Sequence, residues 1–282
     1  MTRSLMQTAI RPEVGSTLRV TRVCLRADAP YGTRVEDTPW GTLVGLATGS
    51  ESGWDCGART LGSPALSLMF DLLRGPDPVA ALPGAFAAGS QCFAADPSFA
   101  ENDEPDLPIL TVVLALCEPR RITLAWVGND KAYLLRDGRV AAQSEEHTRR
   151  MLLRGPLARP LTPTEAAPDE HDIAWRALPA EQRLLGPIRR LFADLPTLVL
   201  SRDVRGPPAM MHLERRPGDM LLLLAGGLHK RLEWDAGLTA ALAPGPLTID
   251  RLVTEIDRRD PRRTGELAGG SDPYGPILLA EL

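Results

Sequence analysis

The chain has 282 residues, of which 44% are hydrophobic and 24% are charged, and its formal net charge is −4 at pH 7. This length and composition are typical of a soluble globular protein with a sizeable core. The weak negative charge gives no electrostatic basis for binding nucleic acid, and no apolar stretch is long enough to cross a membrane. We therefore expect a cytoplasmic protein with neither nucleic acid nor membrane as a partner.

The cysteines and histidines are scattered and form no metal-binding pattern. No two cysteines make a C-x-x-C pair, and the four histidines stand far apart in the chain. The spacing therefore argues against a zinc site and predicts free, buried thiols in a reducing compartment. The four cysteines are Cys24, Cys56, Cys92 and Cys117.

The first hundred residues are predicted to form two strands followed by two helices. Alternating polar and apolar residues predict the first strand, a short apolar run predicts the second, and helical periodicity predicts the helices. Pro83 and Gly84 are expected to interrupt the second helix. In chain order, the elements are strands at 18–25 and 42–47, a turn at 48–53, and helices at 57–73 and 79–95.

Four short strands are predicted next, in a segment with strong turn signals. Asp137-Gly138 is a typical hairpin turn. Successive antiparallel strands favour a sheet with helices before and after it, and thus an α+β protein and not a doubly wound parallel sheet. The expected strands are 109–117, 121–127, 131–135 and 139–143.

The remaining half is predicted to contain an insertion and a final group of regular elements. Residues 154–208 are rich in Pro, Ala and Arg and read as an insertion. We expect a strand at 220–225, a helix at 246–258 and a last strand at 277–282. Without internal repeats, residues 1–282 are predicted to be a single domain.

Several segments, in the right order, resemble a known enzyme family. "LAWVGNDKAYLLRDGRV" begins at Leu124 and resembles the central hairpin of the PP2C (PPM-type) metal-dependent serine/threonine protein phosphatases, which reads Gly-Asp-Ser-Arg at its tip. Also similar to family segments are "ILTVVLAL", "SEEHT", "RRPGDMLLLLAGGLHKRL" and "GSDPYGPILLAEL". The resemblance covers about residues 15–282 and implies an αββα sandwich, with two antiparallel sheets packed together and helices outside.

The resemblance also implies a chemistry that this chain is poorly equipped to perform. Family members use two Mg²⁺ or Mn²⁺ ions, held by converging carboxylates, to ready a water for attack on a phosphoserine or phosphothreonine. Here Thr48, followed by Gly49, stands in place of the acid that bridges both metals, and Gly226 in place of another metal acid. Asn129 replaces the acid at the hairpin tip, and Lys230 replaces a further acid.

Only a remnant of the expected metal ligands is retained. Asp28 and Asp272 match family metal positions, and Glu146 keeps an acid near them. Two carboxylates without the bridging one are too few for a two-metal centre of normal affinity. We expect the Lys230 ammonium, if it points inward, to pair with Asp28 or Asp272 in place of the missing cation.

Three interpretations follow from these departures. The first is a degenerate PP2C-like pseudophosphatase with no catalytic residues and no cofactor, which binds a phosphoprotein, a kinase or a regulatory assembly in phospho-signalling. The second is an active but atypical phosphatase using Mg²⁺ or Mn²⁺, with substitute ligands from Glu36, Asp37, Glu51 or Asp55. The third is an unrelated α+β binding or structural domain. Under the first, the Asn129-Asp130-Lys131 tip is a retained turn and not a working site.

Overall fold

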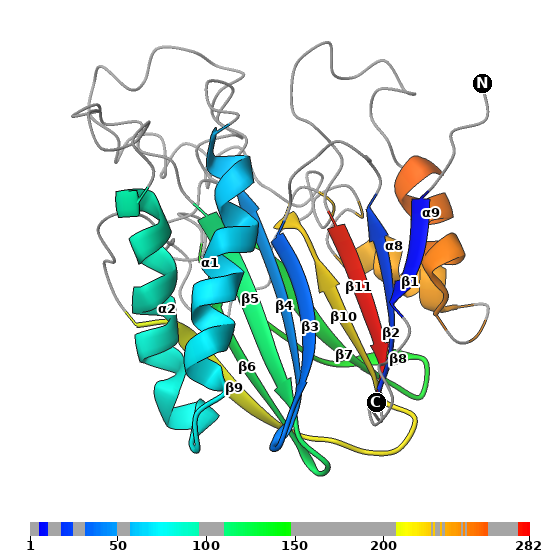
Figure 1. Ribbon diagram of the computed structural model, residues 1–282. Coiled ribbons are helices and arrows are strands. Elements are labelled where there is room, and N and C mark those ends of the chain that lie inside the picture. Colours follow the sequence, from blue (N-terminus) through cyan, green and yellow to red (C-terminus); the bar gives the residue numbers. More distant parts are fainter. Residues whose placement is uncertain are drawn as a thin grey trace, which may run out of the picture.

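Figure 1 shows the computed structural model, which places most of the predicted elements. It describes residues 6–10, 18–24, 32–49, 57–95, 110–147, 207–226, 228, 232, 235–243, 245, 247–258 and 276–282. The insertion predicted at 154–208 lies almost wholly outside the described residues. The insertion and the single-domain boundary therefore stay predictions.

One antiparallel sheet gathers strands from both ends of the chain. Its centre is the pairing of β10 with β11 on one side and β7 on the other, so that Leu222 lies between Leu279 and Tyr133. Within the described residues it has six strands, in the spatial order β1 (Met6–Ile10), β2 (Arg19–Cys24), β11 (Pro276–Glu281), β10 (Met220–Leu224), β7 (Lys131–Arg136) and β8 (Arg139–Gln143).

The second sheet is built mainly from the middle of the chain. All eight residues of its central strand β5 are buried, which explains why that segment is a continuous apolar run and not an alternating one. Within the described residues it has five strands, in the spatial order β3 (Gly32–Thr38), β4 (Gly41–Gly49), β5 (Leu110–Cys117), β6 (Arg121–Val127) and β9 (Ala209–Glu214).

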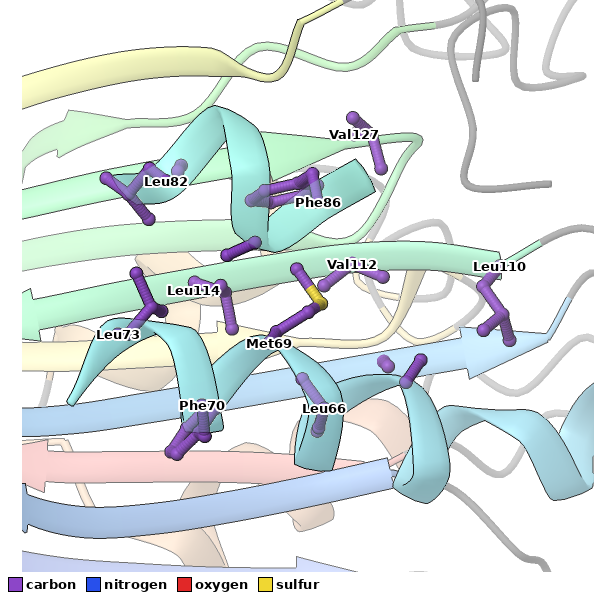
Figure 2. Close-up of a cluster of buried hydrophobic side chains, with 14 of the residues drawn as sticks. Leu66, Met69, Phe70, Leu73, Leu82, Phe86, Leu110, Val112, Leu114 and Val127 are labelled. Atoms are coloured by element: carbon purple, nitrogen blue, oxygen red, sulfur yellow. The ribbon is translucent and has the colours of Figure 1, made fainter. Parts of the chain in front are cut away.

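The two sheets stack between two pairs of helices (Figure 1). Helices α1 (Gly57–Leu73) and α2 (Pro78–Ala95) cover the β3–β9 sheet, and α8 (Asp235–Leu242) and α9 (Ile249–Arg258) cover the other. Figure 2 shows the first helix–sheet core, where Met69 of α1 lies beside Leu114 of β5 and Phe86 of α2 lies on the side of Val127 of β6. A separate core fills the space between the sheets. The predicted α+β class and αββα arrangement are confirmed.

The structure corrects the sequence prediction in several elements. Helix α2 runs through Pro83 without interruption, and β4 continues through Thr48 and Gly49, where a turn was expected. Strands β1, β3 and β9 and helix α8 were not predicted at all. Most residues of β3 are only partly buried and polar, so an edge strand of this kind leaves little apolar pattern to read.

The described part of the chain also contains two of the four cysteines and helices on both faces of the sandwich. Cys92 and Cys117 are buried thiols that form no disulfide, as predicted, while the side chains of Cys24 and Cys56 lie outside the described residues. None of the described helices combines the length and apolar character needed to cross a membrane.

Candidate functional site

The candidate site lies where strand ends of the two sheets meet. Thr48, near the end of β4, pairs with Thr111 near the start of β5. In the other sheet, the first residue of β7, Lys131, pairs with Leu224, the last residue of β10. The turn between β6 and β7 and the residues after β10 therefore face the ends of β4 and β5, and they bring Asp130 and Gly226 to Thr48.

Asp130 joins these strand ends through its side chain. It is fully buried, with 0% of its surface exposed. Its Oδ1 accepts a hydrogen bond of 2.8 Å from the Thr48 hydroxyl and one of 2.9 Å from the backbone N–H of Gly226. Oδ2 is buried and has no hydrogen-bond partner among the described residues. One carboxyl thus links both sheets.

A second hydroxyl extends this linkage into β5. The Thr48 and Thr111 hydroxyl oxygens are 2.9 Å apart. A hydroxyl has one proton, and that of Thr48 goes to Asp130, so within this pair the Thr48 oxygen accepts. The Thr111 hydroxyl also lies 3.4 Å from the carbonyl oxygen of Thr48, a second acceptor for its proton. The result is a chain of hydrogen bonds from Thr111 through Thr48 to Asp130, closed off from solvent because all three side chains are buried.

Burial changes the acidity of this carboxyl. Removal from water raises the pKa of Asp130 to about 7, from an ordinary value of 3.8. The nearby Thr111 hydroxyl, the Gly226 N–H and the Thr48 hydroxyl limit that rise in pKa, because each stabilises the charged form. Near neutral pH, a substantial fraction of the carboxyl is therefore protonated.

Close packing at the tip of the β6–β7 hairpin leaves no room for a larger side chain at two glycines, Gly128 in the hairpin and Gly226 after β10. A Cβ on Gly226 would come within 2.6 Å of Cγ of Asn129. Gly128 has a positive φ of 92°, and a Cβ there would lie 2.3 Å from Cγ2 of Thr111. Gly128 therefore needs glycine for its backbone conformation and its contact, whereas Gly226 leaves space that the Asn129 side chain occupies.

Segment 144–147 braces the same hairpin from the side. Lys131 is buried and donates from Nζ to the carbonyl oxygen of Ser144, and the Ser144 hydroxyl accepts from the N–H of Ala132. Glu146, the acid retained in this segment, is also buried. Because neighbouring strand residues point to opposite faces, Lys131 extends away from Asp130 and towards the ring of Tyr133.

His147 closes the edge of the site. Its ring stacks on Trp126 at a centroid distance of 6.1 Å, and its Nδ1 accepts a hydrogen bond from the Gly128 N–H. The other ring nitrogen therefore carries the proton in the neutral form. Burial lowers the pKa of His147, which favours that neutral form.

The sequence-predicted residues fall into three groups in the structure. Thr48, Asn129 and Gly226 come together around Asp130, with Gly49 and Glu146 in the adjoining segments. Outside the described residues lie Asp28, Asp272, Lys230, Glu51 and Asp55. The proposed pairing of Lys230 therefore stays a prediction.

Glu36 and Asp37 are not substitute ligands for this site. Glu36 pairs with Arg34 and Arg74, and Asp37 accepts a hydrogen bond from Thr42 at the opposite end of β4. Six residues of extended strand separate Thr42 from Thr48, a distance of about 20 Å. The proximity that the second interpretation requires of these two acids is absent.

The described residues do not fit a two-metal centre. Thr48 is neutral, Gly226 has no side chain, and the space beside it is filled by Asn129. Among the described residues, no group of three or more His, Cys, Asp or Glu side chains converges. Among the described carboxyls only that of Asp130 lies at this point; its Oδ1 accepts from a hydroxyl and a backbone N–H, and its side chain is buried.

Comparison with known proteins places the fold. No protein-family model and no curated protein matches the chain. Solved structures do match over nearly its whole length. Serine/threonine phosphatase PstP/Ppp of Mycobacterium tuberculosis is 21% identical, with a TM-score of 0.58 over 94% of this chain and 98% of that one. The chain has the PP2C fold.

Two further structures agree with that assignment. Serine/threonine phosphatase Stp1 of Staphylococcus aureus is 15% identical, with a TM-score of 0.60 over 98% of this chain and 99% of Stp1. The catalytic domain of PstP, solved in complex with two manganese ions, is 22% identical, with a TM-score of 0.57 over 94% of this chain and 97% of that domain. At these identities the likeness extends to the PP2C fold alone.

Sequence reasoning missed the central residue of the site. Gly128-Asn129-Asp130 has the composition of an ordinary hairpin turn, and we interpreted it as one. The turn is present, but Asp130 is buried instead of solvated. The available signal was the simultaneous loss of acids at positions 48 and 226 and the presence of an extra acid at position 130.

Proposed function

We propose that this chain is a pseudophosphatase, a protein with the PP2C fold that acts by binding in phospho-signalling and does not hydrolyse phosphate esters. The observation that carries the proposal is the contact of Oδ1 of Asp130 with both Thr48 and Gly226. These are the two positions where the resemblance to the family requires metal-holding acids. In this chain they are neutral, and a buried side chain already occupies the point between them.

The chemistry of the family depends on what these positions lack. Metal-assisted hydrolysis needs ions that generate a nucleophile and stabilise the charge on the phosphoryl oxygens. Mg²⁺ and Mn²⁺ favour carboxylate ligands, and a threonine hydroxyl or a glycine removes most of that attraction. Without the bridging acid the chain keeps the scaffold of the fold but loses the means to hold two ions.

The partner class follows from the fold's own substrates. A PP2C scaffold without hydrolysis is suited to hold a phosphorylated segment without releasing its phosphate. We therefore propose a phosphoprotein, a kinase or a regulatory assembly as the partner, with no cofactor. A phosphothreonine peptide array, compared with the same peptides unphosphorylated, tests for that recognition.

The decisive assay is hydrolysis. The protein is incubated with millimolar Mn²⁺ and either a phosphothreonine peptide or p-nitrophenyl phosphate, and an active PP2C-fold phosphatase is run in parallel as the positive control. We expect phosphate release no faster than in the buffer. Turnover that requires Mn²⁺ and stops with a chelator would replace this proposal with the active, atypical phosphatase, for which Glu51 and Asp55 are the remaining candidate ligands.

A further inference from the structure

One carboxyl, that of Asp130, contacts both of the positions at which the family resemblance implies metal-holding acids. Asp130 reaches Thr48, 82 positions away, and Gly226, 96 positions away. These contacts join β4 of one sheet to the segments flanking β7 and β10 of the other. The metal-holding acids expected at positions 48 and 226 would lie at the same point.

Charge makes Asp130 incompatible with an acid at position 48. The hydroxyl of Thr48 is 2.8 Å from Oδ1 of Asp130, and both side chains are buried. A carboxylate in place of that hydroxyl would face a second carboxylate at hydrogen-bond distance in a dry environment. Two such groups cannot both ionise without a cation between them.

Space makes Asn129 incompatible with an acid at position 226. The Asn129 side chain lies where any side chain at position 226 would begin, with its Cγ 2.6 Å from the ideal Cβ position. The φ of Gly226 is not positive, so the backbone itself would accept another residue. The obstacle is therefore the neighbouring side chain and not backbone strain.

We propose that positions 48, 129, 130 and 226 form one coupled set, in which the Asp130 carboxyl is an internal substitute for the metal-holding acids. It accepts from the neutral groups left at 48 and 226, and so it ties the two sheets together without a metal ion. This inference rests on the proposed function in taking the two-metal centre as lost. It adds that the loss is compensated within the chain.

A transposition experiment tests the coupling. Thr48→Asp is compared with the double variant Thr48→Asp/Asp130→Thr, which has the composition of the wild type but exchanges the acid and the hydroxyl. We expect the single variant to melt well below the wild type and the double variant to recover most of that loss. The matched control is Thr123→Asp in the wild-type and Asp130→Thr backgrounds, because Thr123 is buried in the same sheet but bonds His212. Asp130→Thr should give no recovery there.

A second comparison tests metal binding. Adding Asn129→Ala and Gly226→Asp to the transposed pair restores both acids and clears the space between them. We expect Mn²⁺ to raise the melting temperature of this quadruple variant by several degrees and to leave that of the wild type unchanged. If the quadruple variant does not fold, the melting temperatures of Thr48→Asp and Thr48→Asp/Asp130→Thr still decide whether positions 48 and 130 are coupled.

The outcomes separate this inference from the proposed function. If Thr48→Asp alone is as stable as the wild type, or gains the Mn²⁺ response with Asp130 intact, the positions are independent and the inference is overturned. An Mn²⁺-dependent rise in the wild-type melting temperature that Asp130→Asn abolishes would make Asp130 a metal ligand and also overturn it. Wild-type hydrolysis of a phosphopeptide would overturn the proposed function, whatever the variants do.

Discussion

The hydroxyl of Thr48 donates a 2.8 Å hydrogen bond to Oδ1 of Asp130 across the space between the two sheets. Thr48 is the penultimate residue of β4 in one sheet, and Asp130 directly precedes β7 in the other. A family member would need a metal-bridging acid at the first position. Here the contact is a hydrogen bond between a neutral donor and a buried carboxyl.

Removing the donor should weaken the fold. Thr48→Val keeps the shape of the side chain but leaves the buried Asp130 carboxyl with one donor fewer. We expect the free energy of unfolding to fall by about 1–3 kcal/mol, measured by urea denaturation. Thr123→Val is the matched control, since it removes a buried hydroxyl bonded to His212 and should cost only about 0.5–1.5 kcal/mol. Equal losses of unfolding free energy in Thr48→Val and Thr123→Val would mean that the Thr48–Asp130 hydrogen bond stabilises the fold no more than an ordinary buried one.

The raised pKa of Asp130 predicts a pH dependence of stability. An unfolded aspartate releases its proton near pH 3.8, whereas the folded carboxyl keeps it until about pH 7. Between these values the folded state binds more protons, so raising the pH lowers the free energy of unfolding by up to about 1.4 kcal/mol per pH unit. The difference between the wild type and Asp130→Asn, measured from pH 4 to pH 8, should show this slope. If the stability curves of the wild type and Asp130→Asn run parallel from pH 4 to pH 8, the pKa of Asp130 is not raised.

The contribution of Asp219 to the free energy of unfolding should change with pH in the opposite direction. Burial raises the pKa of Asp219, but the two hydrogen bonds from Arg136 and the backbone N–H of Arg216 outweigh it, so the net pKa is lowered. The unfolded state then takes up protons first, and the stability that Asp219 contributes above about pH 4 is lost as the pH falls further. Asp219→Asn should remove this acid sensitivity. Comparing it with Asp130→Asn separates the two carboxyls, because their difference curves slope in opposite directions.

The contact between Gly226 and Asn129 predicts a rescue. Gly226→Ala places a methyl group against the Asn129 side chain and should cost about 1–3 kcal/mol of unfolding free energy. Adding Asn129→Ala should recover most of that loss. Gly84→Ala is the control, because nothing lies within 4 Å of its Cβ position and it sits in helix α2, so it should stabilise by about 0.5–1 kcal/mol. Additive costs at positions 226 and 129 would rule out the steric coupling.

Much of the fold could be predicted from local sequence. Asp137-Gly138 predicts the β7–β8 hairpin, and an unbroken apolar run predicts β5. Both signals lie within a few neighbouring residues, so a short stretch of sequence contains them. Edge strand β3 was missed because it presents mostly partly buried polar residues. Helix α2 continues through Pro83, and its packing against the sheet overrides a local preference.

The site was only half predictable, for a physical reason. The resemblance marked positions 48 and 226 as lost acids, since each stands in a recognisable segment. The burial of Asp130 depends on contacts that span 82 and 96 positions, and no local pattern encodes such a contact. A turn composition therefore concealed the most constrained side chain of the site.

The central claim is that this chain no longer holds a two-metal centre, and calorimetric titration of the wild type with Mn²⁺ tests it most directly. At neutral pH we predict no binding of two ions per chain, and the same trace for Asp130→Asn as for the wild type. Saturable binding of two Mn²⁺ ions per chain at micromolar concentration would contradict the account.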